Sequence, residues 1–270
     1  MSLIARAAGA ALLAALAAPA AAQQLPSDLA GGLVAESLWA GGSTLRFVAA
    51  DRETAAVLRP RLETGRRAVE AYFGSPLPDP VAVTLAPDRA AFTAVLRAEW
   101  GAPETQCWMV GTGVADFLVI LSPRDWAAEA CEHDAADSQH VQDIVTHELT
   151  HVYHGQHNPT RDFDGADEVG WFAEGLAVVV AGQLDRGRLS DPREAVRAGA
   201  VPARLADAWS GRYRYGVSGS LVRYIDVTWG RDAVRDLLAV TTQAQLLARI
   251  GVTEQELLDR WKAWVMEPQR

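Results

Sequence analysis

Apolar and polar positions follow two different periods in the first half of the chain. Short runs with a period of two are typical of half-buried strands, and longer runs with a period of 3.6 are typical of amphipathic helices. Asp51 and Asp88 each precede a helical run, where a short acidic side chain can cap the first backbone N–H groups. The pattern predicts strands at 44–48 and 81–85, each followed by a helix, the first ending near Phe73 and the second near Trp100.

A β-hairpin is predicted after the second helix. Residues 108–110 and the apolar run 117–121 bracket Gly111, Gly113 and Asp116, which favour a turn. The run 117–121 is either an interior strand or the edge of the sheet. As an edge strand, it would offer unpaired backbone groups to an extended peptide.

The apolar spacing after residue 138 is almost entirely helical. Strands mixed with helices, followed by helices alone, indicate the α+β class. We therefore expect a small mixed sheet with helices and then a mostly helical C-terminal lobe. The predicted helices are 139–156, 168–182, 204–209, 216–229, 231–240, 243–249 and 253–266.

The first 22 residues have the pattern of a secretory signal peptide. Arg6 precedes an apolar run at 7–18, and Ala20–Ala22 form a small-residue cleavage site before Gln23. The alternative is a membrane anchor, but the run is shorter than the roughly 20 apolar residues that a bilayer span needs. The pattern predicts a secreted or periplasmic protein whose mature chain begins at Gln23.

Charge and cysteine content narrow the function classes further. The formal net charge is −9, which argues against nucleic acid as a partner because phosphate binding needs a basic surface. No later segment is apolar enough for stable membrane insertion. Cys107 and Cys131 are the only cysteines. In an exported chain they favour a disulfide over a thiolate metal site, since their spacing is far from C-x-x-C.

All six histidines lie between residues 133 and 157, and two of them suggest a metal site. His147 and His151 are four residues apart on a segment with helical apolar spacing, so both face one side of the helix. Two imidazoles in this arrangement can share one Zn²⁺ ion. Glu148 lies between them and is placed to accept a proton from a water molecule at the metal.

A catalytic zinc site needs a third protein ligand. Glu174 is a lone carboxylate in an apolar helical run, which is costly to bury unless it is paired or bound to a metal. His154 and His157 are the rival candidates. A straight helix cannot easily bring three successive turns to one ion, so Glu174 is favoured over either histidine.

The stretch HELTH at 147–151, followed by WFAEGLA at 171–177, resembles the gluzincin zinc metallopeptidases, in particular the peptidase-MA-like proteins. The resemblance implies a single zincin-like catalytic domain over 23–270, with a lobe at 43–157 that carries the zinc helix and a helical lobe at 158–270 that carries the third ligand. It implies that His147, His151 and Glu174 are zinc ligands and that Glu148 is the general base. The chain has no aminopeptidase-type G-x-M-E-N stretch, which argues against an aminopeptidase.

The same resemblance suggests that Tyr215 assists the tetrahedral intermediate, as a tyrosine does in the family. Tyr215 could also be a packing residue, and Tyr213 and Tyr153 compete for the role. Asp143 lies one turn before His147 and could orient its imidazole, although a solvated helix charge is the simpler interpretation. His133 is expected at the surface, as is His157, and His140 is expected merely near the start of the zinc helix.

These features together predict a secreted zinc metallopeptidase that acts on a peptide or protein substrate. Two alternatives stay open. The protein could be an envelope scaffold or binding protein that keeps the zinc but has no turnover, or a zinc hydrolase of another amide or an ester. The presence of Glu148 weighs against a scaffold, which has no need of a base.

Overall fold

The computed structural model describes residues 32–39, 41–101 and 104–267. These residues fall into two compact units, one that ends at Gln156 and one that begins at His157. The proposed signal peptide lies outside the described residues. The two units are considered separately below.

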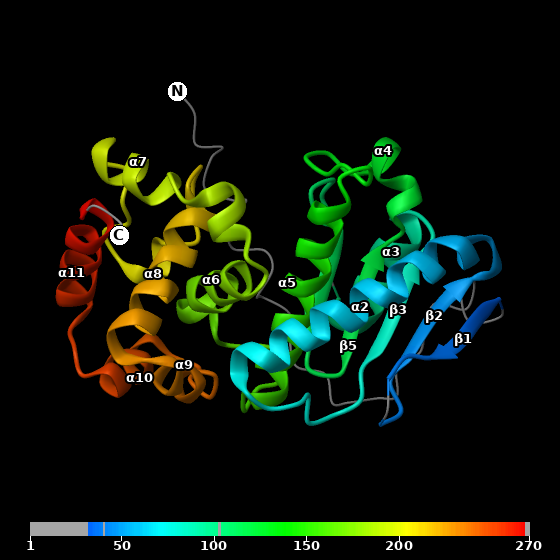
Figure 1. Ribbon diagram of the computed structural model, residues 1–270, viewed down its shortest axis with the longest axis horizontal. Helices are drawn as coiled ribbons and strands as arrows, with labels where there is room; N and C mark the ends of the chain where they lie inside the picture. Colours follow the sequence, from blue (N-terminus) through cyan, green and yellow to red (C-terminus); the bar gives the residue numbers. More distant parts are fainter. Residues whose placement is uncertain (1–31, 40, 102–103, 268–270) are drawn as a thin grey trace. The chain divides into compact units, whose positions relative to one another are not determined.

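The first unit is built on a five-stranded mixed sheet with the strand order β1-β2-β3-β5-β4 (Figure 1). The two inner pairings, β2 with β3 and β3 with β5, are parallel, and both outer pairings are antiparallel. The strands are β1 (Leu33–Ser37), β2 (Thr44–Val48), β3 (Ala82–Ala86), β4 (Gly111–Val114) and β5 (Phe117–Leu121).

The hairpin prediction is confirmed, but its details change. Strand β5 is fully buried and lies between β3 and β4, so residues 117–121 are an interior strand and not an edge. Strand β4, and not β5, is the edge of the sheet. It spans 111–114, so the first strand of the hairpin begins later than the predicted 108–110. Gly111 and Gly113 therefore lie within a strand rather than in the turn.

Helices cover the sheet and bury its apolar side chains. A core of Phe92, Leu96, Val119, Trp126 and Ile144 joins α3, β5 and α5. The helices of this unit are α2 (Arg52–Phe73), α3 (Arg89–Trp100), the short α4 (Trp126–Glu129) and α5 (Ser138–His157), with 3₁₀ turns at Ala49–Asp51 and Pro123–Asp125.

The two predicted caps behave differently. Asp88 accepts a hydrogen bond from the Ala91 backbone N–H at 2.8 Å, as expected of an N-cap. Asp51 holds the N-cap position of α2 without capping it. Its buried carboxylate instead accepts hydrogen bonds from the Ser122 hydroxyl at 2.7 Å and the Arg124 guanidinium at 2.6 Å. Asp51 thus ties the start of α2 to the end of β5.

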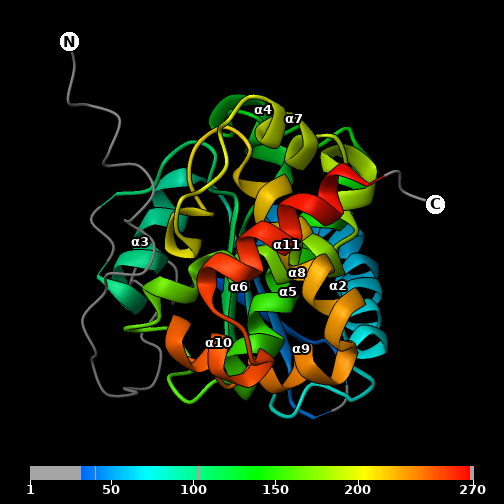
Figure 2. The ribbon, with the colours of Figure 1, turned by 90° about the vertical axis from the view of Figure 1, so that its left-hand side faces the viewer.

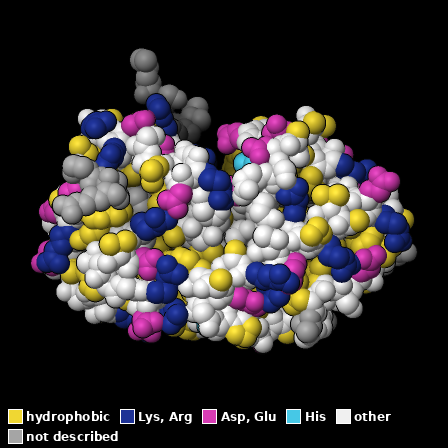
Figure 3. Space-filling model, in the orientation of Figure 1, with side chains coloured by type: hydrophobic (Ala, Val, Ile, Leu, Met, Phe, Trp, Pro, Cys, Tyr) yellow, Lys and Arg dark blue, Asp and Glu magenta, His cyan; other side chains and the backbone are white. Residues whose placement is uncertain are grey.

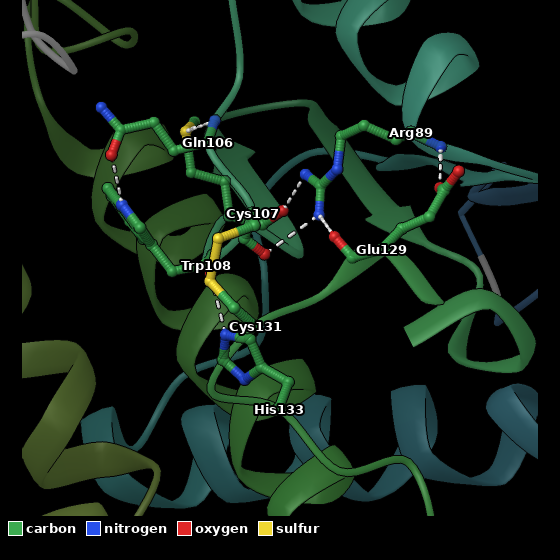
Figure 4. The surroundings of a disulfide bond; sticks show 8 residues. Arg89, Gln106, Cys107, Trp108, Glu129, Cys131 and His133 are labelled. Atoms are coloured by element: carbon green, nitrogen blue, oxygen red, sulfur yellow. Dashed lines mark hydrogen bonds between the residues drawn. A yellow bond between two sulfur atoms is a disulfide. The ribbon is translucent and has the colours of Figure 1, made fainter. Parts of the chain in front are cut away.

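The predicted disulfide is confirmed. Cys107 and Cys131 are joined, with a Cα–Cα distance of 5.2 Å. Figure 4 shows the Arg89 guanidinium beside this bond, where it donates to the backbone carbonyls of Cys107 and Glu129 at 3.1 and 2.9 Å. The segment before α5 is therefore held by a covalent bond and by Arg89 to the residues just ahead of the hairpin.

The second unit is helical, as Figure 2 shows (orange and red for its last helices). Its central pair is α6 (Gly170–Val180) and α8 (Arg214–Trp229). A Cβ atom on Gly175 would lie 2.3 Å from the Ser218 carbonyl oxygen, so only glycine lets these two helices approach so closely. The other elements are α7 (Asp191–Arg197), α9 (Arg231–Leu237), α10 (Gln243–Ile250), α11 (Glu254–Met266), 3₁₀ turns at Asp167–Val169 and Leu205–Asp207, and a π-helical turn at Leu184–Arg188.

A small mixed sheet with helices, followed by a mostly helical part, confirms the α+β class. Among the described helices, none is long and apolar enough to cross a membrane. On the face drawn in Figure 3, acidic and basic side chains are interspersed, so the net charge of −9 does not gather into one patch there.

Candidate metal centre

Helix α5 brings His147 and His151 together on one face. The helix forms because its apolar positions repeat with helical spacing and are buried, among them Val145 and Leu149. Both histidines are buried, each with 8% of its surface exposed, and their Nε2 atoms are 3.1 Å apart. Two ligands of one tetrahedral zinc ion, each about 2.0–2.1 Å from the metal, are about 3.3 Å apart. The pair therefore fits a single zinc ion.

Edge strand β4 packs directly against Glu148. A Cβ atom on Gly111 would lie 2.7 Å from Cγ of Glu148, and one on Gly113 would lie 2.5 Å from the Glu148 carbonyl oxygen. Real Cβ atoms do not approach other heavy atoms so closely. The two glycines thus let β4 pack closely against α5 at Glu148, the predicted base. The Glu148 side chain is half-buried at this contact.

Glu174 belongs to the same candidate group as the two histidines. The ligand atoms of His147, His151 and Glu174 all lie within 4.8 Å of one another, and they make up the only such group of three or more in the described ranges. Glu174 is half-buried on α6. The rival ligands His154 and His157 are not in the group; His154 is buried on α5, with 2% exposed.

Tyr215 lies in the first turn of α8 and is half-buried. Burial raises the pKa of its phenol above 10, and the negative charge of Glu174 raises it further, while the charges of Arg214 and Arg188 partly oppose this. The phenol is therefore protonated at neutral pH and can donate a hydrogen bond. The rival Tyr153 is buried in the first unit, where its hydroxyl lies 2.6 Å from that of Ser75 and its ring stacks on Phe73.

The histidines outside the motif include a pair that the sequence did not reveal. His133 is half-buried, which contradicts the expected surface position. Its Nδ1 lies 2.8 Å from Nε2 of His140, and its Nε2 lies 2.8 Å from the Trp108 carbonyl oxygen (Figure 4 shows the second contact). Desolvation is the main cause that lowers the pKa of His133. Only the disulfide hinted that this segment folds back onto the hairpin.

Asp143 is also not the solvated charge that the sequence favoured. It is buried, with 8% exposed, and accepts a hydrogen bond from the Gln139 amide at 2.7 Å. A buried carboxylate needs polar partners, and the Gln139 amide is one of them.

Comparison with known proteins finds similarity in structure and not in sequence. No family model matches the chain, and no curated protein matches its sequence. Yeast LTA4 hydrolase in complex with bestatin is similar in structure, with a TM-score of 0.52 at 13% identity, over 88% of this chain and 40% of that one. An M1 zinc metallopeptidase from Deinococcus radiodurans is matched with a TM-score of 0.44 at 18% identity, over 88% of this chain and 52% of that one.

The likeness to the yeast hydrolase concerns the fold alone. The chain spans about two-fifths of the length of the yeast hydrolase. At such low identity the similarity carries over the arrangement of elements and not the activity. The protein therefore shares its fold with part of the yeast hydrolase and has a His-His-Glu group that could bind a metal.

Proposed function

We propose that this protein is a zinc-dependent metallopeptidase that hydrolyses peptide bonds after export from the cytoplasm. The observation that carries the proposal is the group of His147, His151 and Glu174, whose donor atoms suit a catalytic zinc ion in number and type. The disulfide and the finding that no described helix could span a membrane are compatible with an exported protein.

When bound, zinc lowers the pKa of a water molecule and polarises the substrate carbonyl. Glu148 accepts the proton of the attacking water at a carboxylate oxygen and then delivers it to the leaving amine nitrogen. Tyr215 donates its phenolic proton in a hydrogen bond to the carbonyl oxygen as negative charge develops there. A tyrosine phenol is protonated at neutral pH at its ordinary pKa near 10, and burial raises that pKa further.

The position of β4 supports a role in binding an extended substrate. This strand pairs only with β5 among the described strands, so its other edge can accept a peptide backbone. Gly111 and Gly113 lie where the strand meets Glu148, so a peptide on this edge would run past the proposed base. The substrate strand is thus expected on β4 and not on the interior strand at 117–121.

The decisive experiment is the Glu148→Gln variant. It should keep about one zinc ion per chain in metal analysis, because Glu148 is not a proposed ligand, and lose peptidase activity by about 100-fold or more, because proton transfer is removed. Glu53→Gln is a matched control, since Glu53 is exposed in the first turn of α2. Full activity in Glu148→Gln would refute the mechanism.

The metal assignment has its own test. His147→Ala should purify without zinc, and chelation of the original protein should abolish the digestion of a peptide library. A protein that binds zinc but digests no peptide, with or without a chelator, would instead support the scaffold alternative.

A further inference from the structure

Arginines and aromatic rings gather at the start of α8. The Arg214 guanidinium lies 4.9 Å from the Tyr215 ring centroid and 5.8 Å from that of Trp209. These two rings meet edge to face at 4.7 Å. Arg188 lies over the Tyr215 ring at 4.8 Å, and Arg212 lies over the Tyr213 ring at 4.9 Å. The rings hold the guanidiniums in place through cation–π contacts.

Two of the three arginines in this cluster pair with carboxylates. Arg188 lies 3.7 Å from the Asp191 carboxylate, and Arg212 lies 3.9 Å from that of Glu194. Within the described ranges, Arg214 has no carboxylate oxygen within 4.0 Å. Its side chain is nevertheless half-buried. A partly desolvated guanidinium without an acidic partner costs free energy that an anionic ligand would recover.

Two further features make this corner favourable for an anion. Arg214 is the first residue of a 16-residue helix, whose N-terminal dipole adds partial positive charge. The N-cap residue Tyr213 supplies no side-chain hydrogen bond to the first N–H groups of the helix. The Asp191 side chain already packs against this first turn at Gly216, so the proposed anion contact is assigned to Arg214 and not to the helix N-terminus.

The cluster lies beside a proposed ligand within the helical unit. Glu174 lies on α6 and Tyr215 lies in the first turn of α8, and these two helices are the central pair of the unit. The close approach of α6 and α8 at Gly175, one residue after Glu174, keeps the two helices in this register. An anion bound by Arg214 would therefore lie near the proposed reaction centre.

We propose that Arg214 is a specificity-determining residue that binds a carboxylate of the peptide substrate near the scissile bond. This inference rests on the proposed peptidase function and adds the substrate class, an acidic peptide. The carboxylate belongs either to an Asp or Glu side chain or to a free peptide C-terminus. A guanidinium oriented by two aromatic rings loses little freedom when it forms a bidentate pair with such a group.

The test uses three matched peptides of one sequence. The first contains Glu and ends in an amide, the second has Gln in place of Glu and also ends in an amide, and the third has Gln and a free C-terminus. We expect kcat/KM to be about 10–100-fold higher for the first or the third peptide than for the second. Whichever carboxylate peptide is preferred identifies the source of the anion.

Substitutions assign the preference to Arg214. In Arg214→Gln the preference should disappear, because kcat/KM for the carboxylate peptide should fall to the value that the same variant shows for the neutral peptide. Arg214→Lys should retain part of the preference, because it keeps the charge but not the bidentate geometry. Arg235→Gln, at an exposed α9 arginine paired with Asp232, should change nothing.

Two results would overturn the proposal: equal cleavage of all three peptides by the original protein, or an equal loss for all three in Arg214→Gln. The second result would mean that Arg214 only positions Tyr215. Calorimetric binding of the peptides to zinc-loaded Glu148→Gln separates this proposal from the peptidase proposal. If a carboxylate peptide binds selectively only when Arg214 is present, but the original protein cleaves none of the peptides, only the peptidase proposal fails. If no carboxylate peptide binds selectively, the Arg214 proposal fails.

Discussion

Gly111 faces the proposed base across a distance that leaves no room for a side chain. In Gly111→Ala the new methyl group would lie 2.7 Å from Cγ of Glu148, so the carboxylate must move. Because small displacements of a catalytic group are costly, kcat should fall about 10–100-fold while the zinc content stays the same. Activity assays paired with metal analysis would show this.

Gly32→Ala is the matched control, since a Cβ atom on Gly32 would meet nothing within 4 Å. It should leave kcat unchanged. Equal activity of the two variants would mean that β4 can shift away from α5, and the strand would then have no part in orienting Glu148.

Spacing in the sequence predicts the relative position of two site residues when both lie on the same helix. The i, i+4 spacing of His147 and His151 predicts their shared face because helix geometry alone sets it, and the Nε2 atoms are indeed 3.1 Å apart. The contact of His133 with His140 was not predictable. It depends on how the disulfide-linked segment returns to the hairpin, which no spacing within the sequence encodes.

At the scale of elements, the Cys107–Cys131 disulfide closes a loop across the β4–β5 hairpin and α4. With a separation of 24 residues, its removal in Cys107→Ser/Cys131→Ser should lower the free energy of unfolding by about 3–4 kcal/mol. The double variant should still fold, since Arg89 holds the same segment by hydrogen bonds to Cys107 and Glu129. Urea unfolding of both proteins measures the difference.

An unchanged free energy of unfolding in the double variant would show that noncovalent contacts alone order this segment. A loss much greater than 4 kcal/mol would mean that Arg89 cannot hold the segment without the disulfide.

Most of the elements were predictable, and the exceptions have a physical cause. Strand β2 and helix α3 match their predicted positions because alternation and the Asp88 cap are local signals. The spacing does not predict strand β1 or helices α4 and α7. Gly111 and Gly113 were expected in a turn because glycine favours turns. They belong to a strand instead, since their lack of side chains admits α5, and that is a tertiary requirement.

At the scale of the whole molecule, His133 should make stability depend on pH. Burial holds its pKa below the ordinary 6.5, and the charges of His140 and Arg89 lower it further. The hydrogen bond to the Trp108 carbonyl and the charge of Glu132 oppose this shift. Below about pH 6.5 the unfolded chain therefore binds more protons at this residue than the folded protein does. The free energy of unfolding should fall as the pH is lowered from 7 through 6, because protonation favours the unfolded chain.

Urea titrations at several pH values test this, with His133→Gln as the variant. The variant should show a shallower decline between pH 7 and 5.5, because it has no group to protonate there. Parallel pH profiles for the two proteins would assign the acid sensitivity to other groups.

The sequence by itself determined the α+β order of elements, the helix that carries His147 and His151, and the cysteine pair. These follow from backbone hydrogen bonding within a segment and from periodic burial, both of which neighbouring residues control. Tertiary structure decided that β4 is the edge strand, that it lies against Glu148, and that Arg214 stands without a carboxylate partner near Tyr215. Each of these features depends on contacts between residues that are distant in the sequence. Such contacts form only when the elements pack together, so local patterns do not predict them.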